Sequence, residues 1–404
     1  MSILGVNSGS SSVKFTMFET NTGRPDVNPK PLYDGEVSNI GETDARLTLQ
    51  KQGAARGSRS SEVKAATSAE AIRLVFDTIC ESAMPTVGAV GYRVVHPGAR
   101  LRGHQKITPE VLRDLQEAVA FAPLHEPTAI RAILEGMQRF PDVDHFACFD
   151  TVFHETMPAQ ATTYPIPKLY RQQGARRYGF HGLSCESVVR QMQAGPERLP
   201  KRMVIAHLGS GCSVTAVIEG KSVDTTMGLT PTGGVVMGAR PGDLDPGLVF
   251  YLLRQQKGDA KEIVSAVEKL FDEKAGIVAV SELSNNMKAT RKAAGQGNAN
   301  ALLALQIFTR SITKAIGGFC WLMGGLDAIV FTGGIGEHDP FTRDEVLANL
   351  QGLGICLDPS LNEAAESGVR RISTPESKVG VIVVPAQEDL MIAQHVNHLT
   401  RIKP

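Results

Sequence analysis

The stretch VNSGSSSVKF, residues 6–15, places a turn of glycine and serine between two runs that are typical of β-strands. The same layout returns in IAHLGSGCSV, residues 205–214, and a β-rich run follows there too. A tight turn of small residues presents several backbone N–H groups in a row, which can hold phosphate oxygens. One such turn is weak support, because ordinary hairpins also use glycine and serine. Two turns at corresponding places predict a duplicated domain with the phosphates of a nucleotide between its halves.

The bulk properties narrow the class of protein. The chain has 404 residues, which is long for a single core and predicts two domains. Its zero formal net charge argues against nucleic acid or an anionic membrane as a partner. The six cysteines show no paired or zinc-type spacing, and the first residues lack the pattern of a signal peptide. No apolar run approaches the roughly 20 residues that span a bilayer. We therefore expect a cytoplasmic protein without a membrane partner.

Short apolar runs bounded by polar residues, glycine or proline predict buried strands. These runs cover residues 87–95, 145–149, 203–208, 327–332 and 379–384. Helices are expected between them, and one opens at Thr108-Pro109-Glu110 with a cap and a first-turn proline. Residues 301–323 predict a long apolar helix that is buried, either within the chain or at a subunit interface. The pairs Thr342/Glu345 and Ser360/Glu363 have the spacing of a capping box that begins a helix. Polar residues 50–64 predict a surface loop with edge-strand connections.

Several predicted strands end in polar residues that a core would not accommodate, and α/β folds bind ligands beyond the carboxyl ends of strands. In the first turn, Asn7 can position a hydrated metal ion and Lys14 can reach a nucleotide. Arg93 interrupts an apolar run, and a buried guanidinium without a partner is costly. We therefore expect Arg93 to hold a carboxylate or phosphoryl anion, with a structural ion pair as the alternative.

Four later residues complete the set of candidates. Asp150 follows a predicted strand and offers oxygen to Mg²⁺, or alternatively caps the next turn, and Glu388 is a second such oxygen ligand. His181 can donate a hydrogen bond to a phosphoryl group, although a lone histidine is commonly structural. Arg240 lies in a loop dense with glycine, where backbone can approach a ligand closely. Residues 331–337 lead a strand into a glycine-rich turn that suits adenosine.

Taken together and in this order, these segments resemble the acetate kinase family (acetate and propionate kinases) over essentially the whole chain. The resemblance implies an α/β fold of duplicated actin/Hsp70/sugar-kinase-like (ribonuclease H-like) domains with an interdomain cleft. An N-terminal actin-like ATPase-type domain would cover residues 1–150, with the C-terminal helix 388–404 packing back on it. A nucleotide-binding and dimerisation domain would cover residues 151–387, and the family is homodimeric.

The resemblance also implies an activity. It is the reversible transfer of a phosphoryl group from ATP to acetate, with Mg²⁺ (or Mn²⁺), giving acetyl phosphate and ADP. Propionate or another short carboxylate is the nearest alternative acceptor, and a non-catalytic actin-like nucleotide switch is a remote one. A sugar acceptor is disfavoured because the implied pocket is small, apolar and paired with an arginine.

The family resemblance assigns roles to matching positions of this chain. The metal positions are Asn7 and Glu388, and the catalytic positions are Arg93, Asp150, His181 and Arg240. The nucleotide contacts are Lys14, His207, Leu208, Gly209, Ser210, Gly211, Asn286, Met287, Lys288, Gly334, Ile335, Gly336, Glu337 and His338. The acyl pocket is formed by Arg93, Val95, Leu124, Phe180 and Pro231.

The chain departs from the family pattern at a few positions. Glu126 stands where the family usually has asparagine, and Cys185 ends a segment that usually reads Gly-Thr-Ser-His. The adenine segment, often Ser-Asp-aromatic-Arg, reads Asn-Asn-Met-Lys at residues 285–288. None of these changes removes a phosphoryl-transfer residue, so we expect activity to be retained. Val95 is bulky enough to close the pocket near a methyl or ethyl group, which predicts poor use of butyrate.

Overall fold

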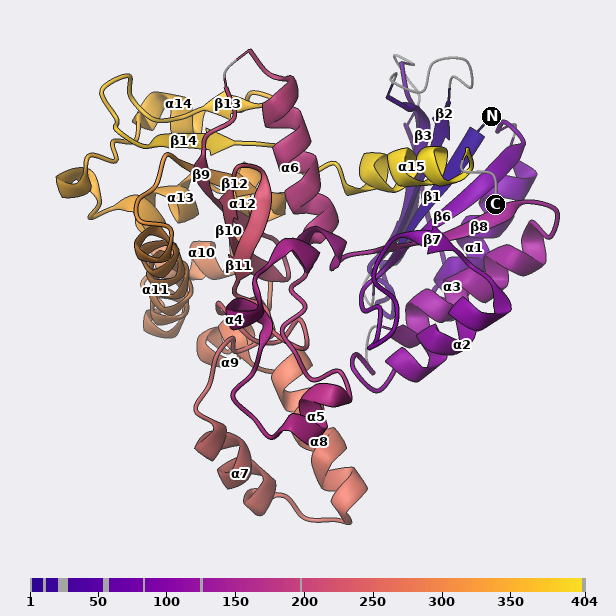
Figure 1. Ribbon diagram of the computed structural model, residues 1–404, viewed down its shortest axis with the longest axis horizontal. Helices are drawn as coiled ribbons and strands as arrows, with labels where there is room; N and C mark the ends of the chain where they lie inside the picture. The colour runs from indigo at the N-terminus through magenta and orange to yellow at the C-terminus, as the bar shows by residue number, and fades with distance from the viewer. Residues whose placement is uncertain are drawn as a thin grey trace. The chain divides into compact units, whose positions relative to one another are not determined.

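The computed structural model describes residues 2–9, 12–20, 28–53, 58–82, 84–123, 126–196 and 198–401. The chain forms two compact units, which we call unit 1 (Met1–Val152 with Gln387–Pro404) and unit 2 (Phe153–Ala386). Figure 1 shows that each unit is built around one sheet with helices packed against it. These boundaries lie close to the expected divisions at residues 150 and 387.

The sheet of unit 1 has eight strands in the order β5-β4-β3-β2-β1-β6-β8-β7. Strands β1 to β5 pair antiparallel in succession, whereas β1, β6 and β8 are parallel neighbours. The strands are β1 (Ser2–Ser8), β2 (Ser12–Glu19), β3 (Lys30–Ser38), β4 (Arg46–Lys51), β5 (Ser58–Glu62), β6 (Val87–Val94), β7 (Gln105–Lys106) and β8 (Asp144–Phe149). The parallel strands bring their carboxyl ends to one edge of the sheet.

Helices cover both faces of this sheet (Figure 1). The helices of one face, which close the hydrophobic core, are α1 (Ser68–Glu81), α2 (Pro109–Ala118) and α3 (Glu126–Arg139). On the other face, α15 (Glu388–Leu399) lies against β1 and β6. Gly91 of β6 permits this close approach, because a Cβ atom there would lie 2.6 Å from the Cγ2 atoms of Ile392 and Val396.

The six-stranded sheet of unit 2 has the order β11-β10-β9-β12-β14-β13. Its strands are β9 (Arg202–Leu208), β10 (Cys212–Ile218), β11 (Lys221–Thr225), β12 (Ala328–Thr332), β13 (Arg370–Arg371) and β14 (Gly380–Val383). Three antiparallel strands, β11-β10-β9, continue into the parallel strands β12 and β14. This order repeats β3-β2-β1-β6-β8 of unit 1, so the predicted duplication is confirmed.

The sheet of unit 2 lies between α6 on one side and α11 on the other (Figure 1). The larger helices of this unit are α6 (Gly182–Ala194), α7 (Pro246–Gln255), α8 (Ala260–Glu273), α10 (Met287–Gly295), α11 (Ala299–Leu322) and α13 (Pro340–Leu347). The short ones are η1 (Val152–Thr156), which begins at the boundary, α4 (Ala159–Thr162), α5 (Lys168–Gln172), α9 (Gly276–Ser281), α12 (Gly333–His338), η2 (Gln351–Leu353) and α14 (Pro359–Glu363). Within the described residues, every helix is too short or too polar to reach across a lipid bilayer.

The five predicted strands are confirmed as β6, β8, β9, β12 and β14, and the helix that opens at Thr108 is confirmed as α2. The two capping-box predictions are wrong about where the helices begin. Helix α13 begins at Pro340 after Asp339, and α14 begins at Pro359 after Asp358. An aspartate followed by a first-turn proline starts each helix three or fewer residues earlier than the sequence pattern indicated.

Two further expectations need correction. Part of the predicted loop at 50–64 forms strand β5, an exposed edge strand paired with β4. The predicted long helix exists as α11, but it is not buried all round, because Leu302, Leu303 and Trp321 are exposed. Only the stripe that faces the unit is covered, as expected for a helix on the outside of a sheet.

Candidate active site

Four predicted site residues meet at one edge of the unit 1 sheet. Arg93 donates from Nη2 to Asp150 Oδ2 at 2.6 Å and from Nη1 to Asn7 Oδ1 at 3.2 Å. Asn7 Nδ2 donates to Glu388 Oε2 at 3.3 Å, and Arg93 Nε lies 4.0 Å from that oxygen. Asn7, Arg93 and Asp150 lie at the carboxyl ends of β1, β6 and β8, and Glu388 begins α15. The sheet therefore holds two carboxylates, an amide and a guanidinium in a single network.

The network is well shielded from water, which governs its electrostatics. The side chain of Asp150 is 1% exposed, and that of Arg93 is 19% exposed. Burial acts to lower the pKa of Arg93, but the carboxylates of Asp150 and Glu388 outweigh it and raise this pKa above its ordinary value. Burial and the Glu388 charge raise the pKa of the neighbouring Asp389 to about 6. Arg93 therefore stays charged and balances a site rich in carboxylates.

The first glycine–serine turn joins β1 to β2, and Lys14 lies directly opposite Asn7 in this antiparallel pair. Opposed residues of an antiparallel pair project from the same face of the sheet. Lys14 Nζ lies 3.7 Å from Glu36 Oε1, and its side chain is about half exposed. Lys14 therefore extends on the face that carries Asn7.

A second cluster forms in unit 2 around two stacked histidines. The rings of His181 and His207 lie 4.0 Å apart and nearly parallel, at 23°. Each Nδ1 is hydrogen-bonded to a buried serine, His181 to Ser213 at 2.9 Å and His207 to Ser184 at 2.8 Å. His181 has φ +58° and precedes the first residue of α6. The two serines fix the orientation of both rings.

Arg240 joins this cluster at the second glycine–serine turn. A Cβ atom added to Gly211 would lie 3.4 Å from His181 Nε2 and 3.5 Å from Arg240 Nη1, so both groups lie over this turn. Arg240 Nη1 also donates to Pro231 O at 3.1 Å. A guanidinium and an imidazole nitrogen therefore converge beside the backbone that is predicted to hold phosphate.

Glycine is required where α12 approaches the same turn. Gly333 has φ +77°, and a Cβ atom there would lie 2.8 Å from Leu208 O and 3.2 Å from His207 Nε2. Glu337 Oε1 accepts hydrogen bonds from the backbone N–H groups of Gly333, at 2.9 Å, and Ala386, at 3.0 Å. Glu337 thus holds the glycine-rich start of α12 in place.

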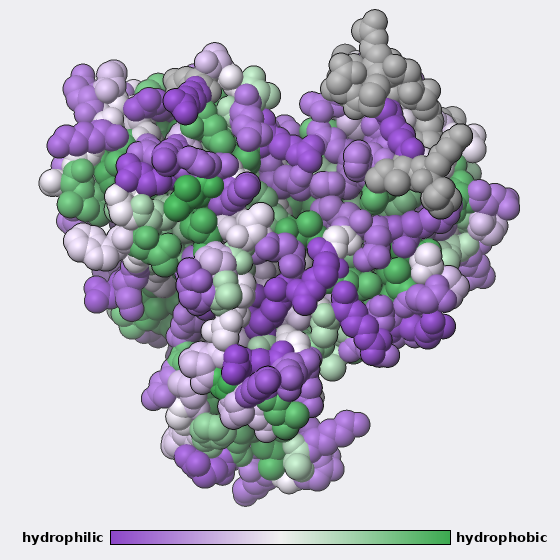
Figure 2. All heavy atoms as spheres, viewed as in Figure 1, coloured by the Kyte–Doolittle hydropathy of each residue, from purple (hydrophilic) through white to green (hydrophobic). Residues whose placement is uncertain are grey.

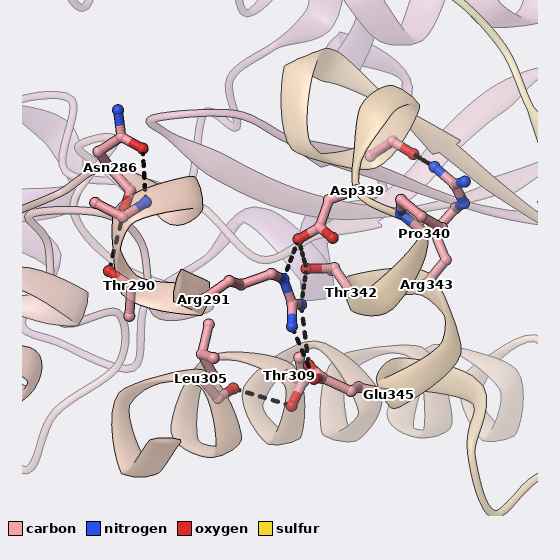
Figure 3. Close-up of polar contacts among 12 residues, drawn as sticks. Asn286, Thr290, Arg291, Leu305, Thr309, Asp339, Pro340, Thr342, Arg343 and Glu345 are labelled. Carbon is pink, nitrogen blue, oxygen red and sulfur yellow. Dashed lines mark hydrogen bonds and ion pairs between the residues drawn. The ribbon is translucent and has the colours of Figure 1, made fainter. Parts of the chain in front are cut away.

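The two stretches predicted to bind adenosine are tied together by Arg291 of α10 (Figure 3). Its Nε donates to Asp339 Oδ2 at 2.6 Å, immediately after α12, and its Nη1 donates to Glu345 of α13 at 2.9 Å. The amino-terminal end of α10 carries Asn286, whose Oδ1 accepts from Ala289 N. One arginine therefore fixes the spacing between residues 286–288 and residues 334–338.

The structure brings the predicted residues together in two sets, one in each unit. Of the predicted acyl pocket, Val95 follows β6 in unit 1, whereas Phe180 and Pro231 belong to unit 2. Leu124 lies outside the described residues. Met287 is buried, so the exposed residues of the adenine segment are Asn285, Asn286 and Lys288.

The sequence did not indicate several neighbours of the predicted site residues. Ser184 and Ser213 orient the two histidines, and Arg291 sets the spacing of the stretches that are predicted to bind the nucleotide. Ser213 could have been found, since it faces His207 in the predicted hairpin of β9 and β10. Nothing in the local pattern indicates Arg291, because Asp339 and Glu345 lie about 50 residues away in the sequence.

The donor atoms of the unit 1 cluster suit a hard divalent cation. Asn7 offers an amide oxygen, and Glu388 and Asp150 offer carboxylate oxygens. Mg²⁺ prefers oxygen ligands and keeps several water molecules, so a few protein oxygens beside a phosphate suffice. The residues present therefore fit the predicted metal.

Comparison with known proteins gives a consistent result. A sequence model of the acetokinase family matches residues 2–394. The acetate kinase of Rhodopseudomonas palustris is 38% identical over 398 residues, covering 98% of this chain and 97% of that protein. An acetate kinase of a Geobacillus strain is 38% identical over 411 residues, covering 99% of both chains.

Solved structures agree with this result. The acetate kinase of Porphyromonas gingivalis superposes with a TM-score of 0.83 at 32% identity, covering 99% of this chain and 100% of that one. A propionate kinase of Francisella tularensis gives a TM-score of 0.86 at 32% identity, covering 98% and 99%. The family match, the relatives and the duplicated sheet order lead to one conclusion: this chain belongs to the acetokinase family.

Proposed function

We propose that this protein is an acetate kinase, which transfers a phosphoryl group reversibly between ATP and acetate to give acetyl phosphate and ADP. The observation that carries the proposal is the network of Arg93 with Asp150, Asn7 and Glu388 in unit 1. Unit 2 adds Arg240 with the two histidines at a glycine turn. The names of relatives at 38% identity over almost the whole chain support the same activity.

Acetate needs no general base, because a carboxylic acid with a pKa near that of glutamic acid, about 4.3, is ionised at neutral pH. The obstacle is repulsion between this carboxylate and the γ-phosphate of ATP. Arg93 has five N–H donors, of which its hydrogen bonds to Asp150 and Asn7 use two. The remaining donors can bind the substrate carboxylate. Asp150 accordingly acts by orienting Arg93 rather than by removing a proton.

The charge of the transferring phosphoryl group is the second requirement. His181 Nε2 and Arg240 Nη1 converge over Gly211 and can donate to equatorial phosphoryl oxygens. The backbone of residues 207–211 and 334–338 would hold the nucleotide. Asn7 and Glu388 would hold Mg²⁺ or Mn²⁺, which neutralises charge on the phosphate oxygens when bound.

A hydroxamate assay with acetate, ATP and Mg²⁺ tests the proposed function, with propionate run in parallel. Hydroxylamine traps an acyl phosphate, so acyl hydroxamate should form together with ADP. Release of ADP without hydroxamate, or no turnover with either acid despite ATP binding, would exclude a carboxylate kinase and favour the nucleotide switch. A much higher kcat/KM for propionate would move the assignment to propionate kinase, the name of one structural relative.

The half-buried Val95 should set the length of the acyl chain. We expect kcat/KM for butyrate to lie at least about tenfold below that for acetate, since one misplaced methylene typically costs 10-fold or more. Val95→Ala should raise the butyrate-to-acetate ratio by about tenfold. The measurement is kcat/KM for both acids in each variant.

Val143→Ala makes the same change in a residue packed on the core of unit 1 and should leave the ratio unchanged. Equal efficiency with acetate and butyrate in the unmodified protein would contradict the assigned pocket.

The protein is proposed to act as a homodimer through unit 2. The outer stripe of α11 exposes Leu302, Leu303 and Trp321, and α7 exposes Phe250 and Tyr251. Hydrophobic side chains also reach the surface around α7, α8 and α11 in Figure 2. Large apolar side chains that are exposed on a subunit in this way are consistent with a protein–protein interface.

Trp321→Glu should shift the protein from dimer to monomer in size-exclusion chromatography with light scattering, because Trp321 is 90% exposed and a charge there opposes burial. Leu353→Glu, at another exposed apolar residue of unit 2, should leave the dimer intact. A monomeric unmodified protein, or a dimer that tolerates Trp321→Glu, would rule out this interface.

The six cysteines all lie in the described residues, and none of them forms a disulfide there; three are buried. This matches a reducing compartment, and we propose the cytoplasm as the site of action.

A further inference from the structure

Glu126 is a buried acidic side chain that the proposed mechanism does not use. It begins α3 in unit 1 and is 0% exposed. Its Oε1 accepts a hydrogen bond from His96 N at 3.2 Å, whereas Oε2 has no hydrogen-bond partner, and no lysine or arginine of the described residues pairs with it. A buried carboxylate without a cation is strongly disfavoured.

Burial raises the pKa of Glu126 to about 8, although the bond from His96 N acts in the opposite direction. The amino-terminal end of α3 also favours the charged form, but its effect is smaller than that of complete burial. Near neutral pH the group is therefore a carboxylic acid. In that form it has an acceptor oxygen and an O–H donor, which is the hydrogen-bonding pattern of a side-chain amide.

The segment that Glu126 holds leads directly out of the proposed substrate site. His96 follows Val95, the proposed wall of the acyl pocket, and lies three residues after Arg93. The His96 ring accepts from Gly98 N at Nδ1, at 2.9 Å, and stacks on Phe121 with the ring centres 5.0 Å apart. The bond between Glu126 and His96 therefore fixes the backbone immediately after β6.

We propose that Glu126, as a neutral carboxylic acid, positions the segment His96–Gly98 and with it the Val95 wall of the acyl pocket. Ionisation of Glu126 places a charge in this dry contact, and the segment must shift to let water reach the carboxylate. The affinity for the short carboxylate substrate then falls while the phosphoryl-transfer residues stay in place. The link to substrate rests on the proposed function.

Charged groups on the elements around α3 do not alter this reasoning, because burial and the His96 N–H alone set the pKa of Glu126. Several charged groups on these elements have other partners. Those on α1, α2 and β6 are Asp77, paired with Arg139; Asp114 and Glu117, paired with Arg100; and Arg93, paired with Asp150. Among the described residues, His96 is a titratable side chain beside Glu126, and its Nδ1 already accepts a hydrogen bond from Gly98 N.

The protonation state is tested on the full chain by thermal unfolding from pH 5 to pH 9. In the unfolded chain a glutamate ionises near pH 4.3, whereas folded Glu126 keeps its proton up to about pH 8, so the folded state loses stability as pH rises between these values. Glu126→Gln removes this loss. The Tm difference between E126Q and the unmodified protein should grow with pH up to about 8 and then level off.

Glu110→Gln is the matched control, since Glu110 is an exposed glutamate in the first turn of α2. The pKa of Glu110 is lowered by hydrogen bonds from its own backbone and from Thr108. The Tm difference between E110Q and the unmodified protein should therefore not grow as pH rises. A Tm difference for E126Q that is flat across this range would mean that Glu126 is ionised in the folded protein, which overturns the proposal.

The positioning role is tested by the pH profile of KM for acetate. In the unmodified protein KM should rise through pH 8 and increase by up to about fivefold between pH 8 and pH 9, while kcat changes by less than twofold. In E126Q the KM should stay within twofold over this range. Parallel KM profiles for the two proteins would overturn the role even if the Tm result holds.

Two safeguards keep the outcomes separate. If E126Q does not fold, Glu126→Asn supplies the same amide chemistry, and the unmodified protein must in any case show the rise in KM near pH 8. If no protein forms acetyl hydroxamate, the proposed function fails, whereas the thermal comparison still decides whether Glu126 is protonated.

Discussion

Replacing Arg240 with alanine should lower kcat for acetyl phosphate formation by about 10²–10³-fold, the usual effect of removing one donor to transition-state charge. Arg240 Nη1 lies beside His181 Nε2 over the backbone of Gly211, where a phosphoryl group would carry its developing charge. The stretches that are proposed to bind the nucleotide are held independently of Arg240, by Arg291 and Glu337. ATP affinity, measured by titration calorimetry, should therefore change little while kcat in the hydroxamate assay falls.

Arg198→Ala serves as the control, because it removes an exposed arginine from the same unit. It should retain full kcat. Arg240→Lys keeps the charge but loses the planar fork of donors, so its kcat should lie between those of the alanine variant and the unmodified enzyme. A near-normal kcat for Arg240→Ala would remove Arg240 from the mechanism.

The duplication of the fold could be predicted from the sequence because it depends on local sequence features. The two glycine–serine turns separate β1 from β2 and β9 from β10, and each pair is an antiparallel hairpin. Buried parallel strands need continuous apolar runs, which is why the central strands were found. The weakly paired edge strand β5 has the exposed polar sequence SRSSE, residues 58–62, which local patterning cannot separate from a loop.

The predicted first residues of two helices were wrong because two capping signals competed. At residues 339–345 and 358–363 the prediction used the capping-box pairs, but an Asp-Pro pair lies just before each of them. Proline in the first turn costs no hydrogen bond and fixes a helical φ, so the earlier start prevails. The prediction that α11 is buried was wrong for its outer face, for another reason. Apolar composition alone does not show whether a helix is covered by its own chain or by a partner.

The candidate site was predictable residue by residue but not contact by contact. A buried arginine in a strand indicated that Arg93 needs an anion, yet the sequence could not name Asp150 as its neighbour. Asn7 and Glu388 are 381 residues apart and meet because α15 packs on β1. That packing depends on Gly91, whose missing side chain carries no apolar signal. Long-range pairing of this kind needs either the fold or a family resemblance.

Arg93→Met should abolish most of the activity and also destabilise unit 1. The substrate carboxylate loses its guanidinium partner, so kcat/KM for acetate should fall by at least about 10²-fold. Asp150 then loses the guanidinium that it contacts, and breaking a buried pair on one side costs about 3–5 kcal/mol. Burial without this guanidinium favours the protonated acid. The stability of the variant should therefore decline further as pH rises above about 4, the ordinary pKa of aspartic acid.

The double variant Arg93→Met/Asp150→Asn separates the two roles of this arginine. It replaces the buried carboxylate of Asp150 with a neutral amide. The stability of the protein should therefore recover and lose its added pH dependence, while the activity stays low. Arg139→Met breaks an ion pair with Asp77 that is more than a third exposed, and it should lower the stability far less than Arg93→Met does. If thermal unfolding found Arg93→Met as stable as the unmodified protein at pH 8, the pair with Asp150 would not be a buried contact. If acetate turnover survived, a different cation would have to hold the substrate, and the site proposed in unit 1 would be wrong.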